Sequence, residues 1–190
     1  MQTEYLIPPD QTGAPAVCIK MYPSGIYFDL LDPQLWDIKP SDIAHHLSLL
    51  NRFVGGTPSA YSVGEHCLLV SNLVERATGD RTLALAGLLH DATEGYLGDV
   101  SGLLKRTDDL AGYRTIEDRL SRVIEKRFVL PEGVLDDPIV KHYDKLAFEF
   151  ECSAVRDAPW RIPPKAHSVK EGYLRRLGDL RPTHLRGPYL

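Results

Sequence analysis

Cysteine is scarce in this sequence. The chain has only Cys18, Cys67 and Cys152, an odd number at spacings that match neither a zinc knuckle nor a small disulfide framework. We therefore expect reduced thiols and a cytoplasmic protein. The sequence also lacks a run of about 20 apolar residues, which is the length needed to span a bilayer, and it has no N-terminal stretch that pairs basic residues with an apolar run. These absences predict a protein that is neither exported nor inserted into a membrane.

An excess of positive charge is also missing. The chain has 22 Lys and Arg against 26 Asp and Glu, which gives a net charge of −4. Without a global basic field, we expect no long nucleic acid as a partner. The residues after Pro159 are more basic, with seven Lys and Arg against two acidic residues, and we interpret this bias as a solvated face.

Internal repeats and low-complexity tracts are absent, and helical periodicity accounts for most of the 190 residues. The sequence therefore predicts an all-α fold in a single compact domain. Prolines interrupt short apolar pieces in residues 1–40, so we expect an irregular lead-in with a small hairpin across Tyr22 to Gly25. The helical core is expected over about 41–156. Residues 157–190 would hold a Pro-rich stretch and a last helix around 169–177.

Local signals indicate where the core helices begin. Ser41 is the predicted N-cap of a helix that runs toward Arg52. Ser62 to Glu65 has the S-x-x-E form of a capping box, and it places His66 in the first turn of a second helix. Gly79-Asp80 then separates two antiparallel neighbours. Further helices are predicted over 110–128 and, from the Asp137-Pro138 start, through Val140, Tyr143, Asp144, Ala147, Phe148, Glu151 and Val155.

Four ionisable residues interrupt a core-like helix over 83–99. They are His90, Asp91, Glu94 and Asp99. An unpaired carboxylate or imidazole in a core costs several kcal/mol, so these groups require a partner. At 3.6 residues per turn, Glu94 lies one turn after His90 and Asp91, and the three can face one point. A bound divalent cation is the simplest partner. The alternative is a satisfied core histidine with an aspartate that closes the helix.

Two more polar residues occupy predicted inward positions on other helices, His66 and Asp144. With His90 and Asp91, they supply two imidazoles and two carboxylates, which is enough for one divalent ion with room for water and a substrate oxygen. These donors suit zinc, iron, manganese, cobalt or nickel. Such an ion lowers the pKa of bound water and polarises a phosphoryl oxygen, so hydrolysis is the expected reaction class.

Other residues are candidates for roles beside this ion. Glu94 would orient or deprotonate the attacking water, or protonate the leaving oxygen. Asp99 would assist it or bind a sugar hydroxyl, unless it only caps the loop over 100–105. Arg52 and Lys105 are candidate phosphate clamps, since guanidinium offers a bidentate fork and ammonium a point charge, although either residue alone also fits a solvated surface charge.

The H…HD…D pattern of His66, His90-Asp91 and Asp144 resembles that of the HD-domain metal-dependent phosphohydrolases. Arg52, Glu94, Asp99 and the order of elements resemble the branch that includes the YfbR-type 5′-deoxynucleotidases and the phage dATP triphosphohydrolases. The resemblance spans about residues 25–180. It is carried by FDLLDP (28–33), DIAHHLSLLNRFVGGT (42–57), YSVGEH (61–66), LLHDATEGYLGDV (88–100) and the Asp144 to Glu151 pair. The segment over 101–105 departs from the proline-containing version expected there but retains Lys105.

This resemblance implies a compact HD-domain helical bundle and a role for each matching residue. The implied metal ligands are His66, His90, Asp91 and Asp144. Glu94 would act on the water with Asp99 beside it, and Arg52 and Lys105 would bind the substrate. Phe53 would stack on the nucleobase, unless it is a core phenylalanine. The ion would be zinc, cobalt, manganese, iron, nickel or magnesium, and a second ion bound with the substrate phosphates is compatible with the pattern.

The leading hypothesis is hydrolysis of the 5′ phosphoester of a deoxynucleotide, with dATP as the favoured substrate and deoxynucleoside plus triphosphate as products. A deoxynucleoside 5′-monophosphatase would share the same site. A non-catalytic nucleotide-binding module is a further alternative, against which the intact Glu94 and Asp99 argue, and a phosphodiesterase for cyclic or signalling nucleotides ranks last among the enzymes. The resemblance also implies a homo-oligomer, either a dimer or a hexamer, in the cytoplasm, which would be that of the host cell if a phage encodes the chain.

Overall fold

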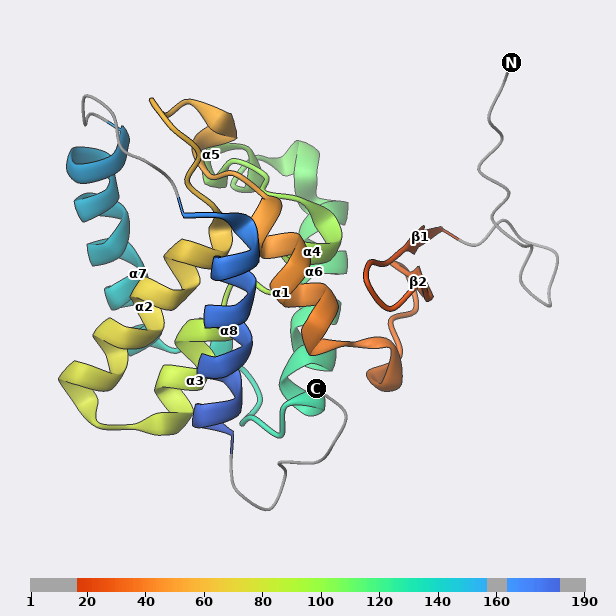
Figure 1. Cartoon of the computed structure of the whole chain (residues 1–190). Coiled ribbons are helices and arrows are strands. Elements are labelled where there is room, and N and C mark those ends of the chain that lie inside the picture. The colour runs from red at the N-terminus through yellow and green to blue at the C-terminus, as the bar shows by residue number, and fades with distance from the viewer. Residues whose placement is uncertain (1–16, 157–163, 182–190) are drawn as a thin grey trace, which may run out of the picture.

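The computed structural model describes residues 17–156 and 164–181, and most of them are helical, as the sequence predicts (Figure 1). The helices are α1 Pro40–Leu49, α2 Val63–Thr78, α3 Arg81–Leu89, α4 Glu94–Leu97, α5 Gly102–Lys105, α6 Ala111–Arg127, α7 Pro138–Glu151 and α8 Ala166–Leu180. Short 3-10 turns lie at Leu35–Asp37, Phe53–Gly55, Asp108–Leu110 and Val134–Asp136, and a π-helical turn at Cys152–Arg156 follows α7. Within these described ranges, no helix has the length and apolar character needed to cross a membrane.

The predicted hairpin is present to one side of the helices (Figure 1). Strand β1 (Cys18–Lys20) pairs antiparallel with β2 (Tyr27–Asp29), with Cys18 opposite Asp29. The Phe28 side chain is fully buried, and its ring lies 4.4 Å from that of Tyr96 in α4. This contact anchors the hairpin to the helical core.

The prediction for the start of α1 was wrong. Its N-cap is Lys39 rather than Ser41, and Pro40 takes the first helical position, where the N–H that proline lacks is not needed. The helix ends at Leu49, so Arg52 lies beyond it in a loop. There the Arg52 backbone N–H donates to the carbonyl of Tyr61 at 2.9 Å, which fixes the loop against the residues that lead into α2.

The predicted capping box is confirmed at the start of α2. The Ser62 side chain accepts a hydrogen bond from the Glu65 N–H, and the Glu65 carboxylate accepts one from the Ser62 N–H. Helices α2 and α3 are antiparallel neighbours, as predicted, and Gly87 faces Ser71 where they meet. A Cβ atom on Gly87 would lie only 3.3 Å from the Ser71 Cα, so this close approach favours glycine. The start of α2 is thereby held near the end of α3.

The expectation of one continuous helix over 83–99 was wrong. Helix α3 ends at Leu89, and the following backbone bonds tighten, with the Ala92 N–H donating to the Leu89 carbonyl and the Glu94 N–H donating to that of Asp91. Bonds between residues three apart give about three residues per turn, which brings side chains three apart onto one side. Asp91 and Glu94 therefore still face a common space.

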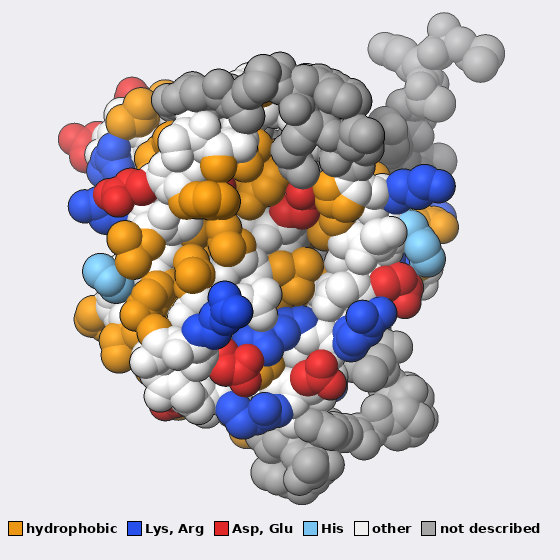
Figure 2. Space-filling view, turned by 60° about the vertical axis from the view of Figure 1, so that its left-hand side comes forward, with side chains coloured by type: hydrophobic (Ala, Val, Ile, Leu, Met, Phe, Trp, Pro, Cys, Tyr) orange, Lys and Arg blue, Asp and Glu red, His pale blue; other side chains and the backbone are white. Residues whose placement is uncertain are grey.

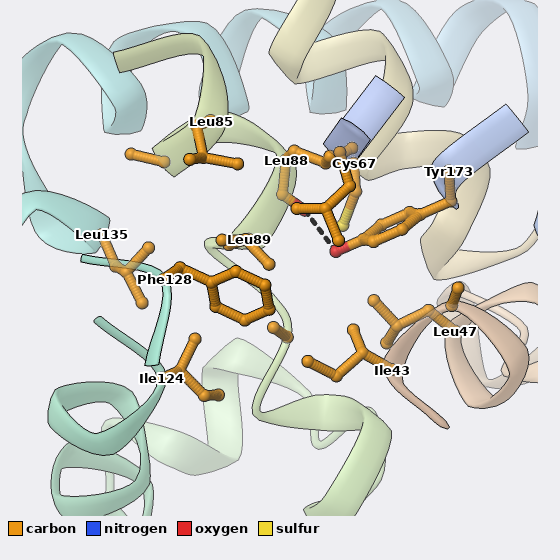
Figure 3. Packing of buried hydrophobic residues seen from close by; sticks show 14 of the residues in the cluster. Ile43, Leu47, Cys67, Leu85, Leu88, Leu89, Ile124, Phe128, Leu135 and Tyr173 are labelled. Carbon is orange, nitrogen blue, oxygen red and sulfur yellow. Dashed lines mark hydrogen bonds between the residues drawn. The ribbon is translucent and has the colours of Figure 1, made fainter. Parts of the chain in front are cut away.

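The remaining helices enclose the end of α3. Helix α6 matches the predicted 110–128 helix to within one residue, and the Asp137 side chain caps α7 by accepting from the Ile139 N–H. Helix α8 is longer than predicted. Figure 3 shows Leu88 and Leu89 packed between residues of α1 and the end of α6, with the Tyr173 hydroxyl of α8 donating to the Leu88 carbonyl at 2.7 Å. The predicted Pro-rich stretch lies, except for Pro164, outside the described residues.

Candidate metal centre

Four predicted ligands, from helices α2 and α7 and the turn after α3, converge on one point. The His66 Nε2 atom lies 3.0 Å from the Asp144 Oδ1 atom, 3.2 Å from the His90 Nε2 atom and 3.6 Å from the Asp91 Oδ2 atom. The His90 Nε2 atom lies 3.2 Å from the Asp91 carboxylate and 3.8 Å from that of Asp144. The sequence prediction that these four side chains meet is correct.

These separations fit a single ion. Ligand atoms about 2.0 to 2.2 Å from a metal lie roughly 3 to 3.5 Å from one another, which is close to the distances observed here. His66 is fully buried, and in this structure its Nε2 atom faces a second imidazole nitrogen and two carboxylates rather than solvent. Imidazole and carboxylate donors suit a divalent transition ion. The four residues are therefore positioned to bind a metal ion.

Cys67 also lies close to His90 and Asp91. Its side chain is buried, and burial, helped by the neighbouring acidic residues, raises the pKa of this thiol well above its usual value. A thiol must lose its proton to ligate a metal. The two histidines and two aspartates are therefore the better donor set.

The imidazoles and carboxylates of this cluster shift one another's pKa values. Burial raises the pKa of a carboxyl, yet the two imidazoles hold the pKa values of Asp91 and Asp144 far below their usual range. Burial lowers the pKa of His90, but Asp91 and Asp144 outweigh it and raise that pKa well above its usual value. The cluster thus attracts positive charge, whether protons or a cation.

Glu94 lies beside the cluster, and it lines the same pocket as Asp91, Asp144 and Arg52. Burial raises its pKa to about 9, and the negative charges of Asp91 and Asp99 act in the same direction. The Lys105 ammonium lies 3.5 Å from the Glu94 Oε1 atom, and it is also held by Glu117 at 2.6 Å. Lys105 is therefore a partner of Glu94 at the pocket wall, which the sequence alone did not indicate.

The remaining predicted site residues also line this pocket. Asp99 is half-buried, and burial raises the pKa of its carboxyl. Within the described residues, the Asp99 carboxylate accepts no hydrogen bond from a backbone N–H of the 100–105 segment, and helix α5 begins after Ser101 without a side-chain cap. Arg52 has its Nη1 atom 3.5 Å from the Asp91 Oδ2 atom. The structure thus brings Arg52, Asp99 and Lys105 into the same pocket as Asp91 and Asp144.

Phe53 forms part of an aromatic wall. It lines the pocket rather than the core, and its ring lies 6.0 Å from that of Phe148. Phe148, which helical periodicity groups with the buried Val140 and Ala147, is 44% exposed and lines the pocket instead. Phe53 and Val54 both have left-handed backbone conformations, with φ of 57° and 54°, which are costly for residues with a Cβ atom. Such conformations persist only where surrounding contacts impose them, so the rest of the structure holds this loop at the pocket rim.

The pocket has a volume of about 630 Å³, and it combines charged and apolar walls. In addition to the predicted ligands Asp91 and Asp144 and the aromatic wall, its lining includes Lys145, Arg106 and Leu103. Figure 2, which turns the α7 side of the molecule forward, shows hydrophobic side chains gathered on this face beside Lys, Arg, Asp and Glu side chains. The volume is in the range of small-molecule sites.

The sequence analysis gave no role to Glu151, which the structure places directly behind His66. Glu151 is fully buried, its Oε1 atom is 2.6 Å from the His66 Nδ1 atom, and its Oε2 atom is 3.1 Å from the Arg52 Nε atom. The Tyr61 hydroxyl donates to Oε1 at 2.9 Å. The available signal was the seven-residue spacing from Asp144, which puts both carboxylates on one face of α7.

Comparisons with known proteins supply relatives but no activity. No family model matches the chain. An uncharacterized protein of Rhodobacter capsulatus is 42% identical over 140 residues, which cover 70% of this chain and 70% of that protein. The uncharacterized protein YfdR of Escherichia coli is 36% identical over 125 residues, which cover 66% of this chain and 64% of YfdR, slightly less than two thirds of its length.

Proposed function

We propose that this chain, which belongs to one family with the uncharacterized protein of Rhodobacter capsulatus, is a metal-dependent phosphohydrolase of deoxynucleotides. The proposed reaction is attack of water at the α-phosphorus of a deoxynucleoside triphosphate, which releases deoxynucleoside and triphosphate. The observation that carries the proposal is the convergence of His66, His90, Asp91 and Asp144 on one point, with the buried Glu94 in the same pocket.

The bound ion would supply a water of lowered pKa and an electrophilic contact for a phosphoryl oxygen. Glu94 has an environment suited to holding a proton, because burial raises its pKa to about 9. It would take the proton of the attacking water or return one to the leaving oxygen, and Lys105 at 3.5 Å would stabilise its ionised form. The donors suit zinc, cobalt, manganese, iron or nickel, with magnesium as a further candidate, and a second ion would enter with the phosphates.

The basic lining of the pocket favours a triphosphate over a monophosphate, and its aromatic wall favours a nucleotide. Its lining includes four basic side chains, those of Arg52, Lys105, Arg106 and Lys145, which is more positive charge than one phosphate requires. The aromatic wall of Phe53 and Phe148 offers a face on which a nucleobase would stack. The preference for dATP rests on the resemblance to the phage triphosphohydrolases, and a 5′-deoxynucleotidase acting on monophosphates remains the alternative.

The test is an activity panel with purified protein, in which dATP, the other three deoxynucleoside triphosphates and the four monophosphates are each incubated with manganese, cobalt or zinc. We expect triphosphate to be released from dATP, whereas orthophosphate released from dAMP would favour the alternative. An Asp144→Asn variant should be inactive, and an exposed control, Asp136→Asn in the turn before α7, should retain activity. No hydrolysis of any substrate with any ion would refute both enzymatic functions.

The same purified protein can be used to test for a non-catalytic nucleotide-binding module and to measure the oligomeric state. A non-catalytic nucleotide-binding module would bind dATP without turnover, and His90→Ala would have no activity to lose. We also propose that the chain forms a homo-oligomer, a dimer or a hexamer, as the resemblance implies. Light scattering of the purified protein measures this directly, and a monomer at assay concentration would refute it.

A further inference from the structure

We propose that Glu151 is the positioning residue of this centre, which holds His66 with its Nε2 atom toward the ion and holds Arg52 toward the phosphate. The inference rests on the proposed function, because it assigns a role to a residue behind that site. Glu151 does not face the pocket itself. It acts through the two side chains that it contacts.

The contacts are those of a fully buried carboxylate shared by three donors. The Oε1 atom accepts from the Tyr61 hydroxyl at 2.9 Å and lies 2.6 Å from the His66 Nδ1 atom. The Oε2 atom lies 3.1 Å from the Arg52 Nε atom, as an ion pair that falls short of an aligned hydrogen bond. A buried carboxylate with no cationic partner is strongly unfavourable, and Arg52 provides that partner.

The contact with His66 fixes the tautomer of the imidazole. An ionised carboxylate only accepts hydrogen bonds, so the proton of a neutral His66 must lie on Nδ1. The lone pair of Nε2 is then directed at the point where Asp91, His90 and Asp144 converge. A carboxylate behind a ligating histidine orients the ring in this way and increases its basicity. Glu151 thus prepares His66 as a ligand before any ion binds.

The contact with Arg52 links the phosphate clamp to the same carboxylate. Arg52 uses Nε toward Glu151 and Nη1 toward Asp91 at 3.5 Å. With a cation held by Asp91, the attraction of Arg52 Nη1 to that carboxylate would weaken, while Glu151 would still hold Nε. The outer edge of the guanidinium then becomes available to phosphate oxygens, for which its fork is suited.

Glutamine at position 151 cannot satisfy both partners. If its carbonyl faces His66 and Tyr61, its NH₂ group opposes the Arg52 N–H; if it flips, the NH₂ group faces His66 Nδ1 and favours the tautomer that blocks Nε2. We therefore expect Glu151→Gln to bind Co²⁺ about 10 to 100-fold more weakly and to show an altered visible absorption spectrum of the bound Co²⁺. It should also bind inorganic triphosphate more weakly. Glu151→Asp, which keeps the carboxylate, should recover part of the Co²⁺ affinity.

Two other variants separate positioning from a general structural role. Arg52→Lys should weaken triphosphate binding while it retains Co²⁺ affinity, because the ammonium still gives Glu151 a cationic partner and His66 and Glu151 remain paired. Asp136→Asn, at an exposed position outside the pocket, should match the wild type in both assays. Co²⁺ affinity of Glu151→Gln equal to that of the wild type would refute the positioning role alone, since the wild type would still be a metal protein. A wild type that binds no ion would refute the proposed function as well.

If Glu151→Gln does not fold, the tautomer of His66 can be measured in the wild-type protein instead. In zinc-loaded protein labelled with ¹⁵N-histidine, we expect the His66 Nδ1 atom to carry a proton protected from exchange and the Nε2 atom to show the shift of a metal-bound nitrogen. A His66 ring ligated through Nδ1, or protonated on Nε2, would refute the inference.

Discussion

Replacing Glu94 with glutamine should stabilise the metal-free protein while it abolishes catalysis. The carboxyl is buried, and its pKa is raised from 4.5 to about 9. In the unfolded chain this group ionises as the pH rises through about 4.5, whereas in the folded chain it keeps its proton to about 9. Between these values, the folded state binds more protons than the unfolded state, so its free energy of unfolding falls as the pH rises. Glutamine has the same shape and does not titrate.

The size of the effect follows from the shift. Each pKa unit corresponds to 1.36 kcal/mol, so a shift from 4.5 to about 9 sets an upper limit of about 6 kcal/mol on the difference reached near pH 9. The Glu94 side chain is only 8% exposed, so solvent screens little of this penalty. Relative to the wild type, Glu94→Gln should therefore gain stability steadily from pH 5 to pH 9.

The assay is urea unfolding of chelator-treated protein at pH 5, 7 and 9, with Glu149→Gln on the exposed face of α7 as the control. We expect a difference that grows with pH for Glu94→Gln and none for the control. A difference that stays constant with pH would mean that Glu94 is already ionised in the folded, metal-free chain. With metal and dATP, loss of a general acid or base should lower kcat by about 10² to 10⁴-fold, and an unchanged kcat would exclude that role.

Three further predictions concern the ion and the phosphate. Saturation with zinc at 100 times its Kd should raise the free energy of unfolding by about 2.7 kcal/mol in a thermal or urea titration, and Asp144→Asn should lose most of this gain. His90 must lose its proton to ligate an ion, and Asp91 and Asp144 raise the pKa of His90 despite its burial. Calorimetry should therefore find weaker zinc binding at pH 6 than at pH 8, and equal affinity at the two pH values would contradict this. Arg52→Lys, which replaces the fork with a point charge, should raise KM for dATP about tenfold and leave the Kd for zinc unchanged.

Short-range signals in the sequence predicted much of the fold and the ligand set. The capping box at Ser62 and the Asp137-Pro138 start are confirmed because caps depend on residues two or three positions apart. The four predicted ligands stand out because each is a polar residue at a position that helical periodicity makes apolar. The break after Leu89 was missed because the apolar pattern on both sides of it has the same period as a continuous helix.

Other features depend on contacts that no local pattern contains. Phe53 and Val54 adopt left-handed conformations although neither is a glycine, so the rim loop is held by its surroundings rather than by its own propensity. Lys105 pairs with Glu94 and Glu117 because α5 packs against α6. The partnership of Glu151 with His66 joins residues 85 positions apart. Each of these contacts requires knowledge of how the helices pack.

Helix α7 supplies two carboxylates to the candidate metal centre, so its packing determines the surroundings of His66. It contacts both nitrogens of the His66 ring, with Asp144 Oδ1 3.0 Å from Nε2 and Glu151 Oε1 2.6 Å from Nδ1. The two carboxylates are seven residues apart, close to two helical turns, and the fully buried Ala147 lies between them where α7 packs on α2. A shift of α7 relative to α2 therefore moves the direct ligand and the residue behind His66 together. His66, held in the first turn of α2 by the capping box, would become a complete ligand only when α7 has docked, so we expect the proposed centre and this helix interface to form together.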